Sequence, residues 1–308
     1  MSEVIVSDYG TRLTRTRIVR TDYRHFAWLV RNGADHPSGS GVNSLAGVEN
    51  LGLQGECPTR LVVPREDGGW LRYEAPGQTP AFYLVFSDDA EARRTLHAAV
   101  SGVGQALRAL HDSPVNVPVR ASPPGIARLE DWLRNKGTAV GDSSRLFTEA
   151  VRILGEKRLS VAQGWIGELL ANGDGSVLLH GAPSLGCLVP SPVRHKHHVL
   201  LTGEELSQGA PELDLGWILG EFAELRMLEA HGRMCLPTAI VAETARQLKV
   251  GYARPIDRRL TGMAATLRVL LHAHDAACYH VWDESLLDYL VFVAELVDGE
   301  GDGAQFPD

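Results

Sequence analysis

Lysine is scarce in this chain, and long apolar runs are missing. The 308 residues contain 30 basic residues, of which only Lys136, Lys157, Lys196 and Lys249 are lysines; the arginine bias is typical of a GC-rich bacterial genome. The formal charge of −8 at pH 7 leaves no basic footprint for nucleic acid or an anionic membrane surface. No stretch of about eighteen apolar residues occurs, and the first residues lack the pattern of a signal peptide. We therefore expect a cytoplasmic protein that binds neither nucleic acid nor membrane.

Cysteine pairs at metal or redox spacing are also missing. Cys57, Cys187, Cys235 and Cys278 lie far apart and form no C-x-x-C motif, which predicts free thiols in a reducing cytosol. The composition, 44% hydrophobic and 22% charged, is that of an ordinary folded protein. A chain of this length can bury a sizeable core and form two lobes.

Short strands are predicted in the N-terminal part of the chain. A β-branched run at 59–63 and a second run at 70–73 predict a hairpin, and a third strand is expected at 81–86. Before them, a short helix is expected from about Thr21 through Arg31. Together these elements predict a small β-rich lobe over residues 1–86.

Apolar residues recur at helical spacing through most of the remaining chain. This pattern predicts a large helical lobe over residues 87–308. The predicted helices cover residues 90–111, 126–133, 143–154, 161–170, 215–230, 237–250, 257–274 and 284–297. The tail from residue 298 is rich in Gly and Asp, and we expect it to be disordered.

The most specific motifs lie in residues 177–216. A predicted strand leads into His180-Gly181-Ala182-Pro183-Ser184-Leu185-Gly186-Cys187; a second strand is followed by Thr202-Gly203-Glu204-Glu205, and Gly209-Ala210-Pro211-Glu212-Leu213-Asp214 opens a helix. This order resembles the aminoglycoside phosphotransferase and choline-kinase branch of the protein-kinase-like fold. That branch has roughly H-G-D-x-x-x-x-N, a hairpin, D-W-E and then G-x-P-x-x-D-L. The resemblance implies a two-lobed α+β fold.

Three residues depart from the family pattern at its catalytic positions. Ala182 stands at the catalytic Asp, Cys187 at a metal-binding Asn and Thr202 at a metal-binding Asp. Phosphoryl transfer needs an oxygen base and oxygen ligands for magnesium, whereas alanine accepts no proton and cysteine is a soft ligand. Losing the base alone costs about two to four orders of magnitude in rate. The departures therefore predict that phosphoryl transfer by the ordinary route is lost.

Other residues match the family frame. Asp214 corresponds to an aspartate that, by resemblance, braces the catalytic segment, although a helix N-cap role explains it as well. His180 matches its family position, and beside Ala182 we expect it to have a structural role. Glu204 keeps the third position of D-W-E, and Glu204 or Glu205 could recruit a cation if the chain were an enzyme.

The β-rich lobe lacks the groups that contact nucleotide phosphates in kinases. Gly52 and Gly55 are too sparse for a glycine-rich loop, and no lysine is available for the strand position. Arg60 and Arg72 are the candidate substitutes, but a planar guanidinium is not equivalent to an ammonium group. We expect no cofactor; ATP and magnesium would bind only if the chain were an active enzyme.

Histidine clusters do not predict a metal site. His195-Lys196-His197-His198 has no Cys or carboxylate at ligand spacing, and such a turn is more often solvated. His274 and Cys278 share a helix face, where ordinary packing is the more common reading.

The resemblance and the departures together predict a pseudokinase, a binding or scaffolding subunit without catalysis. Relatives occur in bacterial clusters for ribosomally made peptides, including class V lanthipeptides, in which a kinase phosphorylates Ser or Thr of a precursor and a lyase eliminates phosphate. A degenerate copy would bind the precursor peptide or stabilise the kinase and lyase. One alternative is a divergent ATP-dependent phosphotransferase acting on a peptide or small-molecule hydroxyl. Another is a protein that binds a small ligand in the cleft where the family binds nucleotide.

Overall fold

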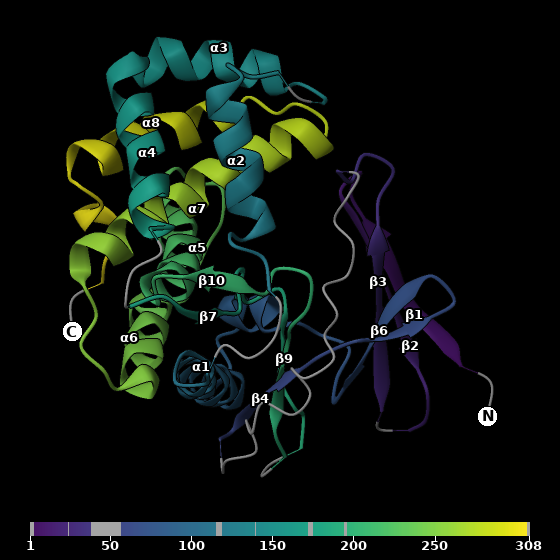
Figure 1. The fold of residues 1–308 in the computed structure, drawn as a ribbon. Helices are drawn as coiled ribbons and strands as arrows, with labels where there is room; N and C mark the ends of the chain where they lie inside the picture. The colour runs from purple at the N-terminus through teal and green to yellow at the C-terminus, as the bar shows by residue number, and fades with distance from the viewer. Residues whose placement is uncertain are drawn as a thin grey trace.

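The structure, a computed structural model, shows a sheet-rich lobe beside a larger helical lobe (Figure 1). It describes residues 3–23, 25–37, 57–114, 119–138, 140–171, 175–193 and 196–306. The two-lobed α+β architecture that the sequence predicted is confirmed.

An antiparallel sheet of five strands forms the first lobe, in the order β1-β2-β3-β6-β5. The strands are β1 (Val4–Gly10), β2 (Thr14–Arg20), β3 (Phe26–Asn32), β5 (Arg65–Asp67) and β6 (Trp70–Ala75). Side chains alternate between the two faces. Ile18 and Trp28 therefore pack on one face, and Val19, Ala27 and Leu29 on the other.

Two further small sheets belong to the segment that carries the motifs. Strand β4 (Thr59–Val62) pairs in parallel with β9 (His198–Leu201), which also pairs with β8 (Leu188–Val189). Strand β7 (Val177–Leu179) pairs with β10 (Ser207–Gly209). Residues 59–62 thus connect the first part of the chain to the second by backbone hydrogen bonds.

The helical lobe is built around α5 (Glu212–Ala230) and α7 (Arg258–Tyr279), which are buried over most of their length. The other helices are α1 (Ala90–His111), α2 (Pro124–Arg134), α3 (Ser143–Ile153), α4 (Gly155–Leu169), α6 (Ile240–Tyr252) and α8 (Leu286–Asp298). Helices α1 and α6 approach closely because Gly251 has no side chain; a Cβ there would lie 1.9 Å from the Ser101 carbonyl oxygen. Within the described ranges, no helix has the length and apolar character needed to cross a bilayer.

Four local predictions are corrected by the structure. The helix expected over 21–31 is instead β3, because a Trp-Leu-Val run alternates between two buried faces. The hairpin turn at Gly68-Gly69 is present, but it joins β6 to β5 and not to residues 59–63. The third strand is a 3-10 helix, η2 (Ala81–Phe86), which starts after Pro80.

The C-terminal tail is the fourth correction. Residues 302–304 form the 3-10 helix η3 (Asp302–Ala304), and the buried Phe306 packs edge-to-face against Phe222 of α5. The Gln305 side chain also donates to the Arg258 carbonyl oxygen, so several contacts hold a segment whose Gly and Asp content predicted disorder.

Candidate functional site

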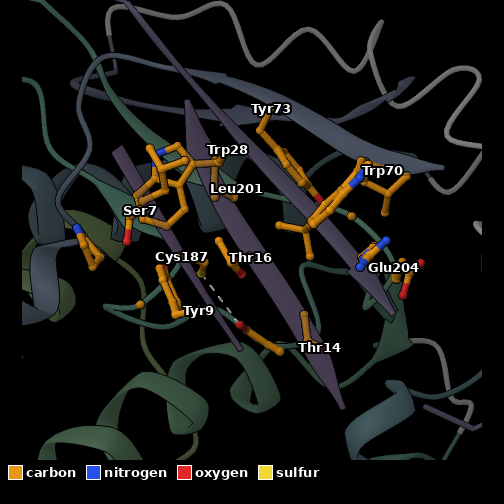
Figure 2. A pocket seen from close by; sticks show the side chains of 18 of the residues that line it. Ser7, Tyr9, Thr14, Thr16, Trp28, Trp70, Tyr73, Cys187, Leu201 and Glu204 are labelled. Atoms are coloured by element: carbon orange, nitrogen blue, oxygen red, sulfur yellow. Dashed lines mark hydrogen bonds between the residues drawn. The ribbon is translucent and has the colours of Figure 1, made fainter. Parts of the chain in front are cut away.

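A cleft of ≈ 1160 Å³ lies between the five-stranded sheet and the motif segment (Figure 2). The sheet side is rich in neutral hydroxyl and aromatic groups: Ser7, Tyr9, Thr14, Thr16, Trp28 and Tyr73. The opposite side is formed by His180, Ala182, Gly186, Cys187, Leu201, Gly203, Glu204 and Glu205. The structure therefore brings five residues that the sequence analysis singled out to one cavity, although they come from different parts of the motif segment. They are His180, Ala182, Cys187, Glu204 and Glu205.

Trp28 braces the two sides of this cleft, and the sequence analysis did not identify it. Its indole N–H donates to the carbonyl oxygen of Gly77 at 2.9 Å, in the stretch that connects the lobes. The side chain is 2% exposed and packs in one cluster with Val189 of β8 and the partly buried Leu201 of β9. One signal was available, since a tryptophan within a strand needs a partner for its N–H when it is buried.

Of the three residues that depart from the family pattern, Cys187 and Thr202 make local hydrogen bonds. Ala182 and Cys187 line the cleft. The Cys187 sulfur accepts from the Ser184 N–H at 3.2 Å, and burial raises the pKa of this thiol to about 11. Thr202 is 0% exposed and its hydroxyl donates to the Leu200 carbonyl oxygen at 3.2 Å. None of the three offers an anionic oxygen to the cavity.

Asp214 holds the motif segment from below. Its carboxylate, 0% exposed, accepts the backbone N–H groups of His180 and Gly181, each at 2.8 Å. The His111 ring lies 3.0 Å from the same carboxylate through Nε2, and its Nδ1 lies 2.9 Å from the Tyr252 hydroxyl. The N-cap position of α5 is Pro211. The Asp214 side chain therefore holds the backbone of the motif segment and does not occupy the N-cap position of α5.

His180 is a buried structural residue in this arrangement. Its Nε2–H donates to the Leu201 carbonyl oxygen at 3.1 Å, and burial lowers the pKa of the ring. Its Nδ1 has no hydrogen-bond partner among the described residues. A neutral imidazole at this place helps to fix β9 beside the segment.

Glu204 and Glu205 make the floor of the cleft acidic. Burial raises the pKa of both carboxyl groups. Glu204 lies 3.9 Å from the Nε2 atom of His36, and Glu205 accepts from the Gly125 N–H at 3.4 Å. Desolvation favours the neutral form of both carboxyl groups, and the positive charges of Arg120 near Glu204 and Arg128 near Glu205 oppose that shift.

Comparison with solved structures identifies the fold. A choline/ethanolamine kinase family protein from Mesorhizobium loti superposes with a TM-score of 0.56 at 16% identity, covering 98% of this chain and 92% of that one. The choline kinase LicA from Streptococcus pneumoniae gives 0.55 at 11% identity, covering 96% and 95%. Spectinomycin phosphotransferase APH(9)-Ia, in complex with ADP and spectinomycin, gives 0.54 at 10% identity, covering 98% and 94%. The chain has a protein-kinase-like fold. No protein-family model and no curated protein matches it by sequence.

In the kinase-like fold, the third strand carries a lysine for the nucleotide phosphates, in the pattern V-A-I-K. Every second residue of β3 from Trp28 onward faces the cleft. These residues are Trp28, Val30 and Asn32, and none of them is cationic. Arg31, over the Trp70 ring at 4.4 Å, also lines the cleft. No lysine is among the β3 residues that line the cleft.

The structure places neither Arg60 nor Arg72 among the residues that line the cleft. Arg72 alternates with the cleft-lining Leu71 and Tyr73 and pairs with Glu3 at 2.7 Å and Glu74 at 2.9 Å. Arg60 is exposed on β4, which pairs with β9. Gly52 and Gly55 lie outside the described residues.

Magnesium does not fit the residues at the family's metal positions. A hard cation needs several oxygen ligands, but Cys187 supplies a protonated sulfur and the Thr202 hydroxyl is buried and donating. The described residues contain no group of three His, Cys, Asp or Glu side chains that could hold a metal ion. No chemical step through a metal is therefore supported at this site.

The other histidine positions serve packing contacts. His197 donates to the Cys57 carbonyl oxygen at 2.9 Å, and His198 accepts from the Ser191 N–H at 3.0 Å. His274 lies 3.3 Å from the Cys278 sulfur through Nε2 and 2.9 Å from Asp275 through Nδ1. His195 lies outside the described residues.

Proposed function

We propose that this chain is a pseudokinase that binds a protein or peptide partner and transfers no phosphate. The observation that carries the proposal is the chemistry of Ala182, Cys187 and Thr202. The first has no proton acceptor, the second holds a thiol whose pKa burial raises to about 11, and the third donates its hydroxyl to a backbone carbonyl. A general base and two metal ligands are therefore lost together.

The charge of the cleft supports the same proposal. Among the described residues that line it, three glutamates, Glu66, Glu204 and Glu205, face one arginine, Arg31. A nucleoside triphosphate brings several negative charges, which an acidic and partly desolvated site disfavours. A neutral polar ligand pays no such penalty, and the hydroxyl and aromatic side chains of the sheet can hydrogen-bond to it or pack against it.

The partner that we propose is a precursor peptide, alone or with the kinase or lyase that modifies it, in ribosomal peptide biosynthesis. An extended peptide is a neutral, hydrogen-bonding chain of the kind that this cleft suits, and its volume of ≈ 1160 Å³ can take a short segment. The four free cysteines are compatible with work in the reducing bacterial cytoplasm.

Titration calorimetry with ATP tests whether the nucleotide and metal sites on which phosphotransfer depends are lost. The full chain is titrated with ATP and magnesium and then with ATP alone, with the choline kinase LicA as the positive control. We expect no heat of binding in either titration. Magnesium-dependent binding at micromolar concentration would contradict our account of the missing ligands.

A divergent phosphotransferase is the second candidate, and the position of Glu204 favours it. This carboxylate lines the cleft, as does Arg31, so the two could stand in for the lost groups. The candidate requires ATP turnover that Glu204→Gln abolishes. Absence of turnover with the tested peptide and small-molecule hydroxyl acceptors would leave the pseudokinase as the better account.

A further inference from the structure

We propose that a groove between the end of α6 and the start of α7 docks an acidic, partly apolar segment of a partner protein. The groove has a volume of ≈ 620 Å³, and none of its lining residues lines the kinase-like cleft. The proposal goes beyond the proposed function, because it holds whether or not the cleft binds nucleotide. In Figure 1 helix α6 lies at the edge of the helical lobe, away from the five-stranded sheet.

The charge of the groove selects an anionic occupant. Arg246, Lys249, Arg254 and Arg258 line it, and its described lining contains no aspartate or glutamate. This is unusual in a chain that has 38 acidic and 30 basic residues. Complementary charge steers a partner to such a surface and fixes its orientation.

Two of these four cations are available to an incoming carboxylate. Arg254 pairs with Asp112 at 2.5 Å, and Lys249 donates to the Phe306 carbonyl oxygen. Arg246 and Arg258 are exposed and make no ion pair within the described part of the chain. Arg258 is also the first residue of α7, directly after Asp257, whose side chain caps the helix by accepting from the Leu260 N–H.

The walls of the groove require that the occupant also carries apolar side chains. Val250 is 61% exposed, Ile256 is half-buried, and Pro255 continues the same surface. An inorganic anion would leave these walls in water. A peptide with an apolar side chain between carboxylates satisfies both parts of the groove.

The groove is held in shape before a partner arrives. Tyr252 at the end of α6 lines it, and its hydroxyl lies 2.9 Å from His111 of α1. Ala253 caps the helix in a left-handed conformation with φ of 52°, and Arg254 is tied to Asp112. A prebuilt surface lowers the ordering cost of binding.

Selection from a phage-displayed library of random peptides tests the proposal without knowledge of the partner. The immobilised full chain is expected to enrich peptides in which an apolar residue lies between Asp or Glu residues. A selected peptide, labelled for fluorescence anisotropy, is then titrated with wild type and with the double variant Arg246→Glu, Arg258→Glu. We expect the reversal to weaken binding by about tenfold or more, and added salt to weaken wild-type binding as well.

The matched control is the double variant Arg134→Glu, Arg152→Glu, which makes the same charge change on α2 and α3. It is expected to bind the peptide like wild type. The proposal is overturned if no peptide is selected, if the selected peptides are not acidic, or if both double variants weaken binding equally. Full competition by inorganic phosphate at millimolar concentration, or a peptide-independent dimer in light scattering, would also overturn it.

Discussion

Replacing Trp28 by alanine tests whether one side chain braces the two lobes across the cleft. The indole is 2% exposed, and it packs with Leu71 and Tyr73 on its own sheet and with Val189 on β8. It also supplies the 2.9 Å hydrogen bond to the Gly77 carbonyl oxygen. The substitution removes both the packing and the bond.

The expected loss in the free energy of unfolding is about 4 kcal/mol. A buried tryptophan removes about 200 Å² from water, which corresponds to about 5 kcal/mol at about 25 cal/mol per Å². The lost hydrogen bond adds about 1 kcal/mol. These two contributions set an upper estimate of about 6 kcal/mol. Truncations of buried aromatic residues cost about 3–5 kcal/mol, and the adjoining cleft lets the site relax, so we expect a loss within that range. Trp28→Phe keeps most of the ring and should cost about 1–2 kcal/mol.

Guanidinium denaturation followed by far-UV circular dichroism measures these losses. The control is Trp282→Ala, because Trp282 lies near the surface, where its N–H donates to Glu284 at 2.9 Å. A Trp28→Ala variant that loses no more stability than Trp282→Ala would refute the brace. Equal losses for Trp28→Phe and Trp28→Ala would show that the hydrogen bond alone matters.

Three further predictions concern the motif segment and its thiols. Asp214→Asn should cost about 2–4 kcal/mol in the same assay, because the charge that accepts two backbone N–H groups is lost; a change below about 1 kcal/mol would contradict the brace. Burial lowers the pKa of His180 in the folded chain, so as the pH falls the unfolded chain binds a proton at this residue before the folded chain does. The free energy of unfolding is therefore unaffected by His180 well above about pH 6.5 and decreases as the pH falls below that value. Between about pH 5 and 7, the free energy of unfolding should depend less steeply on pH in His180→Gln than in wild type. An unchanged pH dependence would contradict the assignment to His180. Because Cys235 is exposed while burial raises the pKa of Cys187 to about 11, iodoacetamide should modify Cys235 first, as peptide mass spectrometry can show; rapid labelling of Cys187 in the folded chain would exclude its hydrogen-bonded burial.

The helical lobe was predictable because its period is local. Apolar residues spaced for one face of a helix predicted α1 and α7 within a few residues of their observed bounds. Strand partners were not predictable in the same way. Residues 59–62 read as half of a hairpin, yet they pair with β9, more than a hundred residues later, and sequence alone does not encode such a distant partner.

The candidate site shows the same contrast between features set by local sequence and features set by distant contacts. Ala182, Cys187 and Asp214 were identified because a short segment resembles a family motif, and the structure brings all three to the cleft or directly beneath it. Arg72 was proposed for the cleft from its residue type, and alternation along β6 turns it to the other face. Trp28 was missed because its role depends on a carbonyl 49 positions away.

By itself the sequence determined which side-chain groups are missing at particular positions. An alanine side chain has no proton acceptor, and a chain without lysine before residue 136 has no lysine for its first lobe, wherever those residues lie. Only the tertiary structure decided which side chains face the cleft. Register places Trp28 and Val30 in the cleft, and burial commits the Thr202 hydroxyl to a backbone carbonyl, because facing and desolvation are properties of the packed chain and not of any single residue.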